Sequence, residues 1–88
     1  MRLNADKIQV GKRYVMVERP LYKAIVTIIA DERGKSGKDW DGWKVRFEEV
    51  HGRMNPKIGT EISVGWSEKY SHYAPIEFYE IEEATNHE

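Results

Sequence analysis

Apolar and polar residues alternate with a period of two in separate segments of the chain, and this alternation limits the fold to one built mainly from β-strands. The clearest segment is 43–48, where Trp43, Val45 and Phe47 alternate with three charged residues. Successive side chains of a strand point to opposite faces of the sheet, so this pattern predicts a half-buried strand. Residues 61–66 alternate in the same way and predict a second one.

Three further segments favour strands for related reasons. Residues 21–31 contain five consecutive β-branched residues, from Ile25 to Ile29, which disfavour a helix and indicate a long central strand. Residues 12–19 also alternate and predict a strand. Pro20 should end this strand because proline has no backbone N–H to donate to a neighbouring strand. Residues 75–83 fit either a closing strand or a short helix that begins at Pro75. We expect the strand, with one short helical turn near the C-terminus.

Glycine-rich and polar stretches separate these segments, at residues 32–42, 52–59 and 67–75. Five strands joined by such turns would leave two exposed edges and one uncovered face in a flat sheet. Closure of the sheet removes the exposed edges and the uncovered face, so we expect an all-β, five-stranded antiparallel small barrel. One domain should span residues 1–88, with its core at about 5–83 and a frayed tail at 84–88.

Three stretches follow one another in a familiar order: VGKRY at 10–14, LYKAIV at 21–26 and WKVRF at 43–47. Over about half its length the chain thereby resembles Tudor domains, which are SH3-like small barrels with a Val-Gly start and similar second and third strands. The resemblance implies an aromatic cage that binds a methylated lysine or arginine through cation–π contacts, with Tyr22 and Phe47 at cage positions. The chain departs from the family at Val50, where a cage would have another ring.

Catalytic and metal-binding patterns are missing from the sequence. The 88 residues include no cysteine, which excludes disulfides and thiolate chemistry and favours the cytoplasm. His51, His72 and His87 are not spaced as a metal set or a catalytic triad. The longest apolar run, 24–30, is far shorter than a membrane helix requires. We expect a non-enzymatic domain with no cofactor, no metal and no membrane contact.

Charge is distributed unevenly along the chain although the formal net charge is −1. Residues 1–44 carry ten Lys and Arg against six acids, a balance of +4, and the second half balances at −5. A solvated surface explains such runs, and so does a dipolar molecule whose basic half faces an anion. The polar loop 32–42 places Trp40 among basic residues, and an exposed aromatic flanked by mixed charges is typical of protein-binding hot spots.

These observations predict an interaction module that binds a protein partner through loop aromatics and mixed charges. The candidate partner-binding residues lie around 33–43 and 70–73 and on the cage strands: Tyr22, Arg33, Lys35, Lys38, Trp40, Trp43, Phe47, Tyr70 and Tyr73. Pairing at a free sheet edge is another mode of binding.

Two alternatives remain open. Basic residues interleaved with an aromatic are also typical of single-stranded nucleic-acid binding. An acidic inhibitor that imitates nucleic acid would instead use a face formed by the glutamates Glu48, Glu49, Glu77, Glu80, Glu82 and Glu83.

Overall fold

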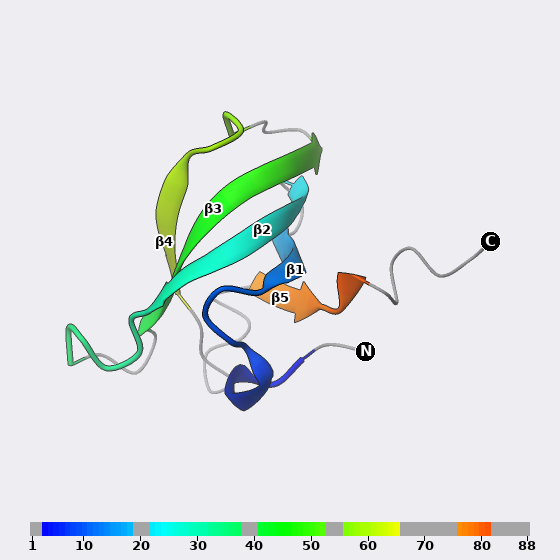
Figure 1. Ribbon diagram of the computed structural model, residues 1–88. Coiled ribbons are helices and arrows are strands. Elements are labelled where there is room, and N and C mark those ends of the chain that lie inside the picture. The colour runs from blue at the N-terminus through cyan, green and yellow to red at the C-terminus, as the bar shows by residue number, and fades with distance from the viewer. Residues whose placement is uncertain (1–2, 19–21, 38–40, 53–55, 66–75, 82–88) are drawn as a thin grey trace.

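Five antiparallel strands form a single sheet in the computed structural model, which describes residues 3–18, 22–37, 41–52, 56–65 and 76–81. A 3-10 turn, η1 (Ala5–Lys7), precedes the strands, which are β1 (Arg13–Glu18), β2 (Tyr22–Asp31), β3 (Asp41–Gly52), β4 (Glu61–Gly65) and β5 (Ile76–Tyr79). Their order in the sheet is β4-β3-β2-β1-β5 (Figure 1). The predicted all-β class with five antiparallel strands is confirmed.

The inner face of the sheet carries the core. On β2, Tyr22, Ala24, Val26 and Ile28 are buried at every second position, so one face of this strand lies in the core. Strands β1, β3, β4 and β5 contribute to the same cluster, and the largest fully buried side chains are Trp43, Tyr14, Phe47, Phe78, Met16, Ile28, Val26 and Val45. The strand residues at alternating positions therefore act as one apolar layer.

The sheet is strongly curved. Strands β3 and β5 are separated by β2 and β1, so in a flat sheet they would lie about 14 Å apart, at ~4.8 Å per spacing. Yet the rings of Trp43 on β3 and Phe78 on β5 pack edge to face with their centroids 5.5 Å apart. Bulges in the β2–β3 pairing, between Ile25 and Val26 and between Ile28 and Ala30, favour this bending. The curvature brings the inner faces of distant strands onto one core.

The predicted closed barrel is wrong, because β4 and β5 do not pair within the described part of the chain. The free edge of β5 is covered in another way: the Leu3 N–H donates to the Phe78 carbonyl at 2.8 Å. Leu3 and Ala5 also pack against the core, and Ile8 belongs to it. The N-terminal segment thus supplies part of the cover that barrel closure was expected to provide.

The phenol of Tyr14 holds this N-terminal segment in place. Its oxygen accepts a hydrogen bond from the Gln9 N–H at 3.0 Å, and its hydroxyl donates to the Lys7 carbonyl at 3.2 Å. The 3-10 turn η1 lies at the N-terminal end, and Ile81, two residues after β5, is also helical. At the C-terminal end β5 is a strand, as preferred, and residues 66–75 and 82–88, which include the positions of the expected turn and the tail, lie outside the described residues.

Candidate functional site

Two residues predicted to form an aromatic cage are part of the core. Tyr22 is 6% exposed and Phe47 is fully buried, and their rings meet edge to face at 5.5 Å. Burial, followed by a hydrogen bond with Glu18, raises the pKa of the Tyr22 hydroxyl above its ordinary value. Both rings are covered by neighbouring side chains, so ligand binding at these two residues would require the core to open.

Arg33 and Trp43, two other predicted contact residues, pack against each other. Trp43 is fully buried, and the guanidinium of Arg33 lies over its ring at 5.3 Å from the centroid. Arg33 donates to both carboxylate oxygens of Asp31, at 3.0 and 2.8 Å, and this pair lowers the pKa of Asp31 to about 2. The guanidinium therefore covers one end of the core, held in position by a bidentate ion pair.

The loop after β2 is braced at its base. The Ser36 hydroxyl and backbone N–H both donate to the Asp41 carboxylate, at 2.6 to 2.8 Å. Lys35 is exposed on this loop. Four further predicted contact residues, Lys38, Trp40, Tyr70 and Tyr73, lie outside the described residues. Partner binding through this loop stays a prediction.

An ion-pair cluster lies on the outer face of the sheet, opposite the core. Glu48 accepts hydrogen bonds from Thr27 at 3.0 Å and from Arg46 at 3.3 Å, and it pairs with Arg13 at 3.6 Å. The hydrogen bonds from Arg46 and Thr27 lower the pKa of Glu48 below its ordinary value. Glu48 therefore pairs with both arginines and compensates one of their two positive charges.

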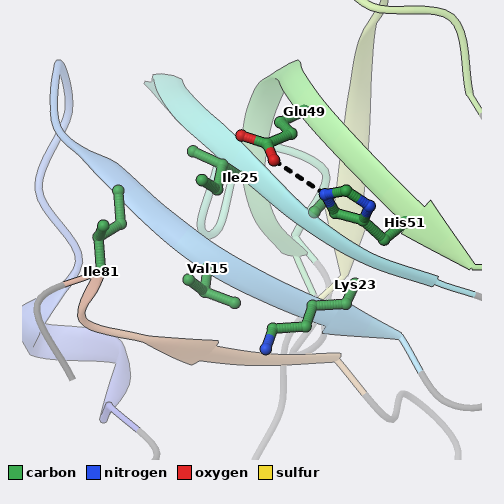
Figure 2. A pocket seen from close by; sticks show the side chains of 7 residues that line it. Val15, Lys23, Ile25, Glu49, His51 and Ile81 are labelled. Carbon is green, nitrogen blue, oxygen red and sulfur yellow. Dashed lines mark hydrogen bonds and ion pairs between the residues drawn. The ribbon is translucent and has the colours of Figure 1, made fainter. Parts of the chain in front are cut away.

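Beside this cluster, the outer face contains a shallow depression of about 180 Å³, which we call the outer-face depression. It is lined by Val15, Lys23, Ala24, Ile25, Glu49, His51 and Ile81, which come from β1, β2, β3 and the residues after β5 (Figure 2). Val15 is 3% exposed without belonging to the core cluster, and Ile25 and Ile81 are half-buried. The apolar side chains of the depression thus form a second, smaller layer behind the sheet.

The β2–β3 bulge places the polar rim of this depression. Ile25 is opposite Glu49 and Val26 is opposite Phe47, so Glu48 is the extra residue of β3. After such an insertion the alternation shifts by one position. Glu48 lies on the outer face with Arg46, two residues before it, and the shift places Glu49 and His51 on that same face, where they line the depression.

The ionisable side chains of the rim differ in whether they have a partner. The His51 Nε2 lies 2.8 Å from a carboxylate oxygen of Glu49, as drawn in Figure 2. Lys23, opposite His51 in the register, is exposed and has no ion pair or hydrogen bond of its side chain among the described residues. Figure 2 shows its side chain extending toward Val15. The rim therefore offers one ammonium group that has no partner among the described residues, beside an apolar floor.

The outer-face depression was not among the predicted sites. One signal in the sequence indicates it: residues 21–31 are apolar on both faces, although a strand with one solvated face would alternate. Ile25 and Ile29, on the face away from the core, are half-buried. The position of Ile81 and the shift at Glu48 have no counterpart in the spacing of the residues.

Comparisons with protein-family models, with curated proteins and with solved structures give no match to this chain. Within the described ranges, no group of three or more His, Asp or Glu side chains is placed to hold a metal ion. Those ranges also contain no helix with the length and apolar character to cross a membrane. The candidate site therefore depends on geometry alone, and the geometry is that of an apolar depression with a charged rim.

Proposed function

We propose that this protein is a non-catalytic interaction module that binds a segment of a protein partner at the outer-face depression. The observation that carries the proposal is the depression itself, in which the half-buried side chains of Ile25 and Ile81 lie beside the buried Val15 and are bordered by Lys23, Glu49 and His51. A protein ligand suits such a surface because its side chains combine apolar groups with hydrogen-bonding and charged groups of both signs. Nucleic acid offers no aliphatic side chain for the floor.

The distribution of arginine contacts supports a protein ligand over a nucleic acid. Arg33 is paired with Asp31, and Arg13 and Arg46 share Glu48. Binding to phosphates gains affinity from cations that neutralise the charge of the nucleic acid, and a carboxylate beside each of these arginines opposes that gain. The residues that line the depression also include no Trp, Tyr or Phe on which a base could stack. Binding of nucleic acid through the basic first half is the alternative that the experiment below separates.

The resemblance to SH3-like barrels enters the proposal at the level of architecture. A curved, five-stranded antiparallel sheet with a single core is compatible with that family. Recognition of a methylated residue is not part of the proposal, because Tyr22 and Phe47 are buried. We assign the module to the cytoplasm on the basis of its lack of cysteine.

The proposal is tested by affinity capture from a lysate of the source cells, treated with nuclease, with three versions of the tagged 88-residue protein. Ile25→Asp places a charge in the floor of the depression. Ile58→Asp is the matched control, because Ile58 is 56% exposed in the turn before β4. We expect a set of proteins that the wild type and the control retain and that Ile25→Asp loses, as measured by quantitative mass spectrometry.

Circular dichroism and thermal unfolding establish that each variant is folded, and Ile25→Ala serves as a milder substitution if Ile25→Asp unfolds. Retention of the same proteins by the folded Ile25 variants would contradict binding at the depression. Capture that disappears on nuclease treatment would instead favour the nucleic-acid alternative.

A further inference from the structure

We infer that the outer-face depression selects an acidic segment of its partner, in which an apolar side chain enters the floor and a neighbouring carboxylate pairs with Lys23. The inference rests on the proposed function, because it specifies the chemistry of the ligand at the same surface. It goes beyond that function by assigning a role to one lysine and a sign of charge to the partner.

Charge complementarity carries the inference. The depression is bordered by three ionisable side chains, and two of them, Glu49 and His51, already pair with each other at 2.8 Å. Lys23 is the third, and none of the ion pairs within the described residues includes it. A ligand carboxylate would compensate this charge, whereas a ligand ammonium would have to compete with His51 for Glu49.

The placement of Lys23 suits a ligand that is both apolar and acidic. Lys23 and Ile25 are two residues apart on β2, so their side chains leave the same face of the sheet. Val15 lies opposite Ile25 on β1, and Val17 lies opposite Lys23. An extended segment that packs an aliphatic side chain against Ile25 therefore brings the side chain of its next-but-one residue near the Lys23 ammonium.

The neighbouring carboxylates do not remove this preference. Glu49 is across from Ile25 and is engaged by His51. Glu77 of β5 is opposite Val17, so one strand separates it from Lys23. Glu48 is held by Thr27 and the two arginines. Lys23 is the ionisable group of the lining that has no partner among the described residues.

The test is selection from a display library of random peptides on the 88-residue protein, followed by measurement of individual affinities. Peptides are kept for analysis only if Ile25→Asp abolishes their binding and Ile58→Asp does not. We expect these peptides to contain Asp or Glu within two residues of an aliphatic residue. Lys23→Glu should weaken them about fivefold or more, because an exposed ion pair is lost and a repulsion replaces it.

Lys57→Glu is the matched control, since Lys57 is also exposed and lies before β4, outside the lining of the depression. It should leave the affinities unchanged, and a second selection on Lys23→Glu should enrich Lys or Arg in place of the acids. Peptides that depend on Ile25 but show no acidic preference, with equal affinity for Lys23→Glu, would overturn this inference and leave the proposed function standing. Failure to obtain any peptide that depends on Ile25 would count against the proposed function itself.

Discussion

Phe78→Ala tests whether the curvature of the sheet is maintained by contacts between distant strands. The Phe78 ring is fully buried, and it packs edge to face against Tyr14 at 6.3 Å and against Trp43 at 5.5 Å. Loss of a buried phenyl ring lowers the free energy of unfolding by about 3–5 kcal/mol. A chain of this length has a total of about 4–13 kcal/mol, so the variant should be marginally stable or unfolded.

The assay is thermal and urea unfolding followed by circular dichroism. Each kcal/mol corresponds to about 4–8 °C in Tm for a domain of this size, so Phe78→Ala should lower Tm by at least about 12 °C. Phe78→Leu provides a milder step if the alanine variant is unfolded, and Ile58→Ala, at a 56% exposed site, should change stability by less than about 0.5 kcal/mol. In a double-mutant cycle, Phe78→Leu and Trp43→Leu should couple by about 0.5–1.5 kcal/mol. A loss below about 1 kcal/mol for Phe78→Ala, or additive effects in the cycle, would refute a core shared by β3 and β5.

Three further predictions concern single polar groups. The raised pKa of Tyr22 means that the unfolded chain loses its phenol proton at a lower pH than the folded chain does. The free energy of unfolding should therefore decline as pH rises above about 10, and Tyr22→Phe should reduce that decline in urea titrations. An equal decline in the wild type and in Tyr22→Phe would contradict the raised pKa. The pKa of Asp31 is lowered to about 2, so this carboxylate should stabilise the fold above about pH 4 and lose that effect as pH falls toward 2. Asp31→Asn should remove this pH-dependent part of the stability, as measured by acid unfolding. An acid unfolding curve that Asp31→Asn leaves unchanged would contradict the prediction. Thr27→Val keeps the shape of a 9% exposed side chain but removes its hydrogen bond to Glu48. Chemical denaturation should show that the free energy of unfolding falls by about 0.5–1.5 kcal/mol. An unchanged denaturation midpoint would contradict a stabilising role for this hydrogen bond.

The strands and the inner face could be predicted because alternation reports directly which side of a strand is buried. The strand predicted at residues 21–31 is β2 (Tyr22–Asp31), and Trp43, Val45 and Phe47 are buried as their pattern predicts. The start of β3 was placed too late, since Gly42 was interpreted as part of a loop. In the structure Gly42 is buried within the strand, and its carbonyl accepts the Glu32 N–H at 2.9 Å. A single glycine does not end a strand when a hairpin partner satisfies its backbone.

The segment that covers the free edge of β5 could not be predicted. Alternation indicates where strands lie, but it does not indicate which other segment packs against their edges. The segment 3–9 has no strand pattern, yet it forms hydrogen bonds to β5 through Leu3 and to Tyr14 through the Gln9 N–H and the Lys7 carbonyl. Such contacts depend on three-dimensional proximity that residue spacing does not record.

Prediction of the candidate site would also have required three-dimensional contacts that residue spacing does not record. Trp43 was assigned both to the core strand and to a binding surface, and its burial under Arg33 favours the first assignment. The outer-face depression requires the shift at Glu48, which moves Glu49 and His51 onto the face of Val15 and Ile25. A bulge changes the face of every later residue in a strand, so alternation counted from the start of β3 misplaces these two side chains.

Binding at the outer-face depression is the central claim, and NMR titration of the ¹⁵N-labelled protein with a peptide from the display selection tests it most directly. The account predicts that the largest amide shift changes occur at Val15, Lys23, Ile25, His51 and Ile81, the residues that line the depression. The same peptide should produce no such changes in Ile25→Asp. Changes concentrated instead in the loop at 33–37, or along the β4 edge, would contradict it.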